Sequence, residues 1–416
     1  MMMMTIQSTT ESTPTDDVLH QHRITQALQQ AKRVVIKFGS QILVDEHGRL
    51  AIDKLAALVR QCSELVNRGK QVIVISSGAI ASGRFQLGFS LEQPLTRVQK
   101  QACAAAGQSS MMHTYQELFR HYGLGVAQVL LNPSDFSQRW RYLSAKALLE
   151  ELLRLGVVPI LNENDALSES GLFEQPSTVA ATSFGDNDKL SALVSAQLEA
   201  DLLLVLSNVE GIFTANPFED PTAVRIPLIS QLEELSRINT AGKSQSGRGG
   251  MSAKLDAAHL AAQCGVHIII ATGLANQAIG RLFEFTSEDA YFPATFIMAH
   301  PENNHNSVKW WNGLASGYSG VITINAGAKE ALLQRGASLL AVGIVSVQGD
   351  FTHHQVVSVV DDTGLELGRG VVQFSAQELQ WIAGKSKTEV RERYGNEFAN
   401  LAVIHRDKLF LSTEEG

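Results

Sequence analysis

The chain has 416 residues, 44% of them hydrophobic, which is enough for two or three domains with sizeable cores. Its formal net charge of −8 at pH 7 argues against a general nucleic-acid or membrane-surface binder, because those partners attract basic proteins. The sequence has no apolar stretch of the roughly 18 residues that a membrane span needs, and its three cysteines have no metal-ligand spacing, so we expect reduced thiols and a cytoplasmic protein.

The composition changes along the chain and indicates where domains begin and end. Residues 1–27 are polar and lack the apolar segment of a signal peptide, so we expect a disordered N-terminal tail. We expect the rest to form a larger α/β domain at 28–290, a linker at 291–317, a small β-rich domain at 318–400 and a C-terminal tail at 401–416.

Apolar strands alternate with amphipathic helices from Arg33 onward. The expected strands are Val34–Phe38, Gln71–Ile75, Val126–Leu131, Val157–Leu161, Leu202–Leu206 and His267–Ala271. The expected helices are Ile52–Val66, Thr96–Arg120 (which Gly107 could interrupt), Arg139–Leu153, Lys189–Glu199 and Ala253–Cys264. This alternation predicts an α/β fold with a mostly parallel sheet, covered by helices on both faces and complete by Gly273.

Small and polar residues directly follow four of these strands. Because crossovers are right-handed, the carboxyl ends of parallel strands share one edge of the sheet. Lys37 is unusual there, since it interrupts an otherwise apolar strand end. A lysine in this position could simply reach solvent, but beside glycine-rich turns phosphate binding is the better interpretation. The four clusters are Lys37–Ser40, Ser76–Ala79, Asn162–Asp165 and Ser207–Asn208.

The segment Val157–Leu193 combines a buried strand, a polar loop and a helix. In α/β proteins this layout presents a site at the carboxyl edge of the sheet. Asn and Asp side chains can hold a small polar substrate, and carboxylates can hold a hard cation. The simpler alternative is that Asp188 only caps the helix that follows. The polar residues concerned are Asn162, Asn164, Asp165, Asp186, Asn187 and Asp188.

A second glycine-rich segment, Gly247–Lys254, precedes a predicted helix. Exposed backbone N–H groups and the helix dipole make such a loop an anion site, although a flexible linker is the alternative. Lys254 in the first turn favours the anion site, because a cation there opposes the dipole unless an anion lies between them. Together with Lys37 and the carboxylate–amide loop, this segment predicts phosphoryl transfer.

Five stretches, in this order, resemble the amino acid kinase family, and within it the branch that acts on glutamate. The resemblance implies an open αβα sandwich that uses ATP to phosphorylate the γ-carboxylate of L-glutamate. The product would be γ-glutamyl phosphate, in the first step of proline biosynthesis. The stretches are VVIKFGS, VIVISSGAIASGR, VVPILNENDA, FGDNDKLSAL and GRGGMSAKLDAA.

The resemblance also assigns roles to residues of this chain. It implies a catalytic set of Lys37, Lys254, Asp186 and Asp188. It implies a glutamate site of Ser77, Gly78, Asn164, Asp165 and Asn187. It implies an ATP site of Lys37, Gly39, Ser207, Asn208, Arg248, Gly249, Gly250, Met251, Ser252, Ala253 and Lys254. Asp186 and Asp188 would organise the loop and could contribute to the magnesium shell, although no direct metal ligand is assigned, since Mg²⁺ would arrive with ATP.

The chain departs from the family pattern at three places. Asn208 stands where the family usually has Asp, and Ala253 where it usually has Thr, so some nucleotide contacts should differ. The segment 166–184 is longer than usual, and we expect an enlarged flap over the glutamate site. Aspartokinase and uridylate kinase are the alternatives within the family, and the NENDA and GDND motifs favour glutamate over both.

Short Val/Ile runs bounded by turns predict a small β-barrel at the C-terminal end, which resembles a PUA domain. RNA binding is the rival function, but Tyr318–Lys408 contains nine Lys and Arg against ten Asp and Glu. We interpret the local basic group of Lys385, Lys387, Arg391 and Arg393 as a solvated helix face. The resemblance further implies a homo-oligomer (dimer or tetramer), feedback inhibition by L-proline and a glutamyl phosphate reductase partner, whereas the charge and hydropathy of the chain are the reason that we expect no membrane association.

Overall fold

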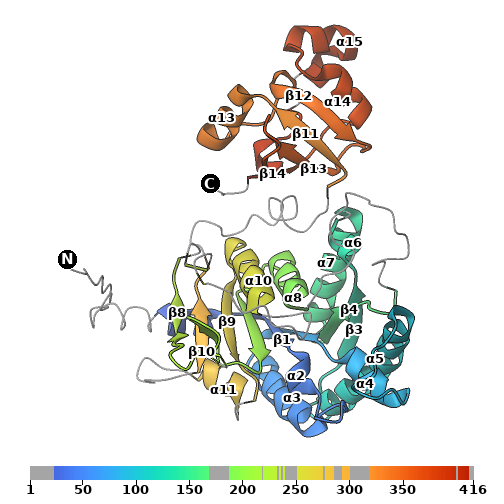
Figure 1. Ribbon diagram of the computed structural model, residues 1–416, viewed down its shortest axis with the longest axis vertical. Coiled ribbons are helices and arrows are strands. Elements are labelled where there is room, and N and C mark those ends of the chain that lie inside the picture. Colours follow the sequence, from blue (N-terminus) through green and yellow to red (C-terminus); the bar gives the residue numbers. More distant parts are fainter. Residues whose placement is uncertain are drawn as a thin grey trace, which may run out of the picture.

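A computed structural model describes residues 23–137, 139–167, 187–217, 219–231, 234, 235, 238, 251–274, 277–284, 293–299, 318–399 and 402–411. It contains a large α/β domain and a smaller C-terminal domain (Figure 1). Among these residues, no helix combines the length and the apolar character needed to cross a membrane.

The α/β domain is built on a mostly parallel eight-stranded sheet, as predicted. The strand order is β3-β4-β2-β1-β5-β9-β10-β8, and β10 runs antiparallel to β9. All six expected strands are present. The strand bounds are β1 Arg33–Phe38, β2 Gln71–Ser76, β3 Val126–Leu131, β4 Val158–Glu163, β5 Leu202–Ser207, β8 Leu228–Ile229, β9 His267–Thr272 and β10 Ala294–Ile297.

Helices cover both faces of this sheet, which gives the predicted αβα sandwich (Figure 1). Alternate residues of one strand supply the two cores: Val35 of β1 packs with one layer of helices, and Ile36 packs with the other. The first layer contains α7 Arg139–Arg154, α8 Asn187–Gln197 and α10 Met251–Gln263. The second contains α2 Ser40–Leu43, α3 Ile52–Asn67, α5 Arg97–Arg120 and α11 Ala278–Phe283.

Gly107 does not interrupt α5, so the long helix expected from the sequence is continuous. It lies within the helix, where α5 packs closely against α4 (Ala79–Gln86). A Cβ atom on Gly107 would lie 1.9 Å from the carbonyl oxygen of Ala79, so only glycine allows this approach. The glycine therefore serves helix packing rather than helix termination.

Two expected boundaries at the ends of the α/β domain are wrong. Residues 23–30 are helical, and Ile24 and Leu28 are buried against the second helix layer, so the expected tail of 27 residues is too long. Strand β10 lies inside the expected linker and adds Ala294 and Phe296 to the same core, so the sheet is not complete by Gly273. Strand β10 has only four residues, which is too short for a pattern of apolar and polar residues to predict it from the sequence.

The C-terminal domain, residues 318–411, has a separate five-stranded sheet in the order β12-β11-β13-β14-β15. Strand β15 and the buried Val403 and Ile404 lie in the stretch that we expected to be a tail, and β15 pairs with β14. The element bounds are β11 Gly320–Ile324, α13 Ala326–Arg335, β12 Ile344–Gly349, β13 Val356–Val360, β14 Glu366–Val371, α14 Ala376–Ile382, α15 Lys387–Ala399 and β15 Leu409–Leu411.

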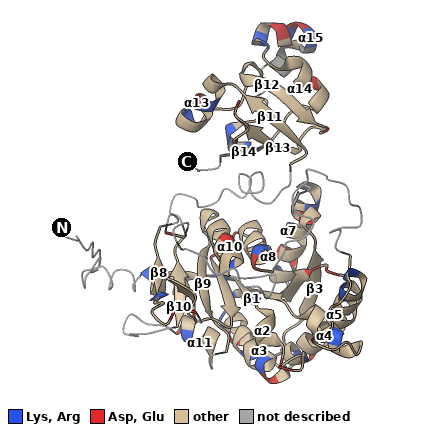
Figure 2. Cartoon of the chain, viewed as in Figure 1, with Lys and Arg blue, Asp and Glu red and all other residues tan. Residues whose placement is uncertain are grey.

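The basic group of the C-terminal domain lies at α14 and α15, where acidic and basic side chains are interspersed (Figure 2). Lys385 Nζ lies 3.4 Å and Arg393 Cζ 4.3 Å from the ring centroid of Trp381, so two cations of the group pack on one indole. Val356 of β13 and Val371 of β14 belong to the same hydrophobic cluster as side chains of α7, α8 and α10. The C-terminal domain therefore packs on that layer of the sandwich.

Candidate active site

The polar ends of the central strands meet at one edge of the sheet. Strands β2 and β5 both pair with β1, and β4 pairs with β2, all in parallel. The chain leaves this edge at Gly39, Ser77, Asn164 and Asn208, directly after each strand ends. Right-handed crossovers thus bring together residues from four distant parts of the sequence.

A buried carboxylate lies between two buried lysines at this edge. Lys37 Nζ is 2.6 Å from Asp188 Oδ1, and Lys254 Nζ is 2.9 Å from Asp188 Oδ2. Asp188 is fully buried, and Lys37 and Lys254 are 3% and 8% exposed. Lys37 comes from β1, whereas Asp188 and Lys254 come from the first turns of α8 and α10.

Electrostatics keep this carboxylate ionised. Burial raises the pKa of Asp188, but the two neighbouring ammonium groups lower it more, so the pKa stays below the ordinary value of 3.8. Asp188 is the second residue of α8 and its carboxylate contacts both lysines, so the alternative that it only caps the helix is wrong. Because two cations share one anion, the triad carries a net positive charge that suits a phosphate group.

The neighbouring residue, Asn187, joins the triad to a network of amide and hydroxyl groups. Asn187 Nδ2 shares its two hydrogens among three acceptors: Asn162 Oδ1 at 2.8 Å, Ser77 Oγ at 2.9 Å and the carbonyl oxygen of Ser76 at 3.2 Å. Gly78 follows with φ of 101°, a left-handed conformation that favours glycine, and precedes the first residue of α4. In the first turn of α8, Asp188 thus contacts the two lysines, and the preceding residue, Asn187, contacts Ser77.

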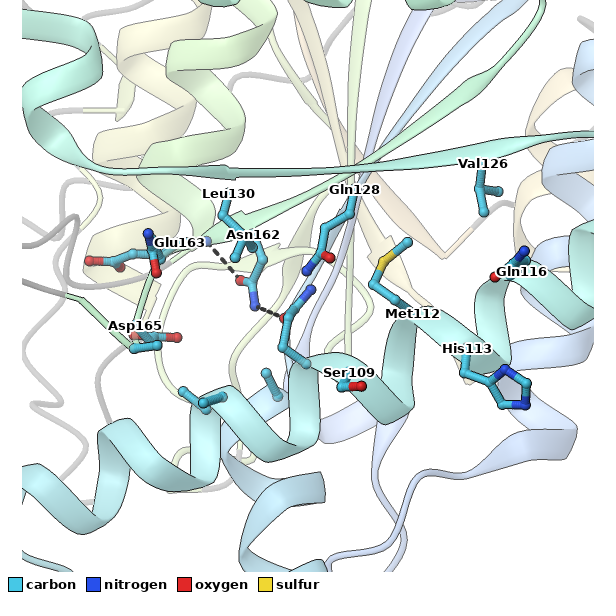
Figure 3. Close-up of a pocket in the computed structure, with 16 residues that line it drawn as sticks. Ser109, Met112, His113, Gln116, Val126, Gln128, Leu130, Asn162, Glu163 and Asp165 are labelled. Carbon is cyan, nitrogen blue, oxygen red and sulfur yellow. Dashed lines mark hydrogen bonds between the residues drawn. The ribbon is translucent and has the colours of Figure 1, made fainter.

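A pocket of about 570 Å³ opens beside this network, between α5, β3 and the end of β4 (Figure 3). Asn164 and Asp165 line it, together with Asn162 and Glu163. Asn162 and Glu163 are the last residues of β4 and are buried, so the expected loop Asn162–Asp165 begins two residues later than predicted. Pockets of this size hold small molecules, and the convergent polar groups can orient one.

Asn162 and Gln108 line the pocket but were outside the glutamate site that the resemblance implies. Asn162 was already expected at this edge of the sheet, as the first residue of the polar cluster that continues to Asn164 and Asp165. Gln108 is a buried amide on the inner face of α5, between the apolar residues Ala104 and Met111. A polar residue on an apolar helical face is visible in the sequence, but its partner is not.

The predicted nucleotide residues lie at the ends of β1 and β5. The Gly39 N–H donates to the carbonyl oxygen of Leu206 at 2.9 Å, which holds the two strand ends together. Ser207 Oγ donates to Asn208 Oδ1 at 3.2 Å. Met251, Ser252 and Ala253 form the first turn of α10 with Lys254. Asp186, Arg248, Gly249 and Gly250 lie outside the described residues, as does most of the long segment 166–184.

The described residues do not form a metal site of their own. None of their His, Cys, Asp and Glu side chains gather in groups of three or more. Asp188 has both carboxylate oxygens next to lysines, so it is not available in this arrangement as a ligand for Mg²⁺.

Comparisons with known proteins agree with this fold. Residues 32–272 match the amino acid kinase family, and residues 320–394 match the PUA domain. The chain belongs to the amino acid kinase family, with a PUA domain after the kinase domain.

The similarity to individual proteins shows to which branch of the amino acid kinase family the chain belongs. The chain is 39% identical to Glutamate 5-kinase of Trichlorobacter lovleyi over 93% of this chain and 98% of that protein. It is 38% identical to Glutamate 5-kinase of Moorella thermoacetica over 92% of this chain and 97% of that protein. Within its family, the chain is a member of the glutamate 5-kinase branch.

One solved structure is more distantly similar. UMP kinase from Ureaplasma parvum aligns with a TM-score of 0.43 and 14% identity, covering 65% of this chain and 99% of that one. This likeness is too low to bear on the function of the chain.

Proposed function

We propose that this chain transfers the γ-phosphoryl group of ATP to the γ-carboxylate of L-glutamate, forming γ-glutamyl phosphate in the first step of proline biosynthesis. The observation that carries the proposal is the placement of Asn187 and Asp188 in one helical turn. Asn187 contacts Ser77, and Asp188 contacts both buried lysines. A substrate held by Asn187 would lie beside the cations that phosphoryl transfer requires.

In this proposal Lys37 and Lys254 stabilise the negative charge of the phosphoryl group as it moves. Asp188 holds both ammonium groups in place before the substrates bind, so little reorganisation is needed during the reaction. Asp188 is thus a positioning group, and the lysines are the catalytic residues. The reaction needs little covalent chemistry from the protein, because alignment and charge stabilisation supply most of the catalysis.

Glutamate would bind in the pocket beside β4. Its carboxylates need donors, which the Asn187 and Asn164 amides, the Ser77 hydroxyl and the backbone of Gly78 can supply. Its α-ammonium group needs an acceptor, and Asp165 offers a carboxylate at the pocket wall. This arrangement supports an acidic amino acid as the phosphoryl acceptor.

ATP would bind along the ends of β1 and β5 and the start of α10, at the predicted residues Gly39, Ser207, Asn208 and Met251–Lys254. Arg248, Gly249 and Gly250 stay predicted contacts to its phosphates. An amide at Asn208 in place of the usual carboxylate removes a negative charge from this side. Mg²⁺ would be carried by the ATP phosphates and keep several waters. Asp186 would organise the loop before α8.

Other parts of the proposal concern partners and location. We expect a cytoplasmic homo-oligomer, either a dimer or a tetramer, that is inhibited by L-proline. An acyl phosphate hydrolyses easily in water, which favours a nearby glutamyl phosphate reductase that consumes it. RNA binding by the C-terminal domain is not supported, because two cations of its basic group pack on Trp381.

The test is ADP release from ATP with glutamate, aspartate or UMP offered separately, with hydroxylamine added in parallel. A γ-glutamyl phosphate would be trapped as a hydroxamate, so both signals should appear with glutamate alone. UMP is scored by ADP release, since it gives no acyl phosphate. A Lys254→Ala protein prepared identically controls for contaminating kinases. ADP release with UMP or aspartate, and none with glutamate, would contradict the proposal.

A further inference from the structure

Gln108 is a buried polar residue that the proposed reaction does not use directly. It lies on α5, is 7% exposed and lines the pocket beside β4. We propose that Gln108 is a positioning residue for the phosphoryl acceptor, because it fixes the orientation of the Asn162 and Asn187 amides; this inference rests on the proposed glutamate site.

A chain of hydrogen bonds connects Gln108 to the acceptor site. Asn162 Nδ2 donates to Gln108 Oε1 at 3.0 Å, and Asn162 Oδ1 accepts from Asn187 Nδ2 at 2.8 Å. Asn187 in turn contacts Ser77 Oγ at 2.9 Å. Figure 3 shows the first of these bonds as a dashed line from Asn162. Gln108 therefore makes no hydrogen bond to Ser77 or Asn187, the residues proposed to bind glutamate, but is connected to both through Asn162.

The direction of every bond in this chain is determined by one backbone group. The N–H of Glu163 donates to Asn162 Oδ1 at 2.9 Å, and a backbone N–H can only donate. The Asn162 oxygen must therefore face Glu163 and Asn187, and its NH₂ group must face Gln108. Gln108 supplies the acceptor that this NH₂ group needs. Without it, the Asn162 amide would lose the partner that opposes rotation.

The Nε2 atom of Gln108 indicates that this side chain does not serve the stability of the fold alone. Gln108 Nε2 is buried and has no hydrogen-bond partner within the part of the chain that the structure describes. An unpaired buried donor is unfavourable, and an apolar side chain of the same size would avoid that cost. A need for the glutamine oxygen to orient Asn162 would explain why this position has a glutamine in spite of the cost of its unpaired N–H group.

The position of Gln108 relative to the site is also tightly fixed. Its neighbour Gly107 packs against α4 so closely that an added Cβ would lie 1.9 Å from the carbonyl oxygen of Ala79. Helix α4 begins at Ala79, two residues after Ser77. Further along α5, Tyr115 Oη lies 2.8 Å from Ser76 Oγ. Helix α5 is therefore held against the start of α4 on one side of Gln108 and against the end of β2 on the other, which fixes the position of Gln108 beside Asn162.

The experiment compares the full-length protein with Gln108→Met, which keeps the side-chain length and removes the acceptor. We expect the KM for glutamate to rise about tenfold, the effect of losing one well-oriented hydrogen bond, with the KM for ATP within about twofold of wild type. The melting temperature should change little, since the variant also removes an unpaired donor. Gln101→Met is the matched control, because Gln101 is also a glutamine of α5 but does not line the pocket.

A double-mutant cycle with Asn187→Ala separates positioning from a general structural role. If Gln108 acts through Asn187, then Gln108→Met should raise the KM for glutamate much less in the Asn187→Ala background than in wild type. Additive effects, an unchanged KM in Gln108→Met, or equal increases for both substrates with a lowered melting temperature would each overturn the inference. Wild-type activity with glutamate is measured first, so failure of the proposed function itself would be recognised separately.

Discussion

Replacing Asp188 by Asn should destabilise the protein strongly, although the two side chains have the same shape. The change removes the negative charge that both Lys37 and Lys254 contact, at 2.6 and 2.9 Å. It also turns one acceptor oxygen into a donor that faces an ammonium group. Two buried ammonium groups would then lie close together without the negative charge of Asp188 between them.

The size of the effect follows from the burial of the triad. Removing one partner of a buried ion pair typically costs ~3–5 kcal/mol, because the remaining charge stays buried. For a domain of this size, that cost corresponds to a fall in melting temperature of roughly 6–20 °C. Asp256→Asn is the control, since Asp256 lies exposed on α10 and its replacement should change stability by less than about 0.5 kcal/mol.

The assay is thermal unfolding followed by circular dichroism, repeated over a range of pH. The pKa of Asp188 is lowered in the folded protein, so its stabilising effect is complete above its ordinary value of 3.8 and is lost as the pH falls below it. The difference between wild type and Asp188→Asn should therefore be constant near neutral pH and shrink below about pH 4. A variant that melts within about 2 °C of wild type at pH 7 would show that the lysines do not depend on Asp188.

Four further predictions concern activity and the C-terminal domain. Lys37→Ala and Lys254→Ala should each lower turnover on the order of a hundredfold, or ~3 kcal/mol, in an ADP-release assay; turnover within a few-fold of wild type would remove that lysine from the mechanism. Asp165→Ala and Asn187→Ala should raise the KM for glutamate far more than that for ATP, and equal effects would indicate a structural loop. A chain ending near Pro301 keeps β10 and every described catalytic residue, so it should phosphorylate glutamate with lower thermal stability; folded but inactive protein would contradict this. The isolated C-terminal domain should bind RNA weakly with a shallow salt dependence in a filter-binding assay, and tight, steeply salt-dependent binding would restore the RNA hypothesis.

The sequence alone was sufficient for the strands and helices that carry long apolar patterns. Continuous Val, Ile and Leu runs define β1, β2, β4, β5 and β9, because the middle of a strand buried on both faces is apolar, and the polar residues of these strands stand at their ends. The same runs place the polar residues that follow them at one edge of the sheet. This is why Lys37, Ser77 and Asp165 could be assigned to one site although they are far apart in the chain.

Elements without a long pattern depended on tertiary contacts. Strand β10 has four residues, and β15 has three, so each is stabilised by pairing with a neighbouring strand rather than by its own periodicity. Gly107 reads as a helix breaker in isolation, yet close packing against α4 makes it necessary within α5. In these cases the deciding partner is distant in sequence, and local propensity says nothing about it.

The site shows the same division at the level of single side chains. The sequence identifies Lys37, Lys254 and Asp188 as charged residues next to apolar elements. Only the tertiary structure shows that one buried carboxylate neutralises part of the charge of both lysines. Likewise, Gln108 and Asn162 lie 54 positions apart, and the hydrogen bond between them exists only because α5 packs over the end of β4. Residue type and spacing determine which groups reach the edge of the sheet, whereas the packing of helices against it decides which groups pair.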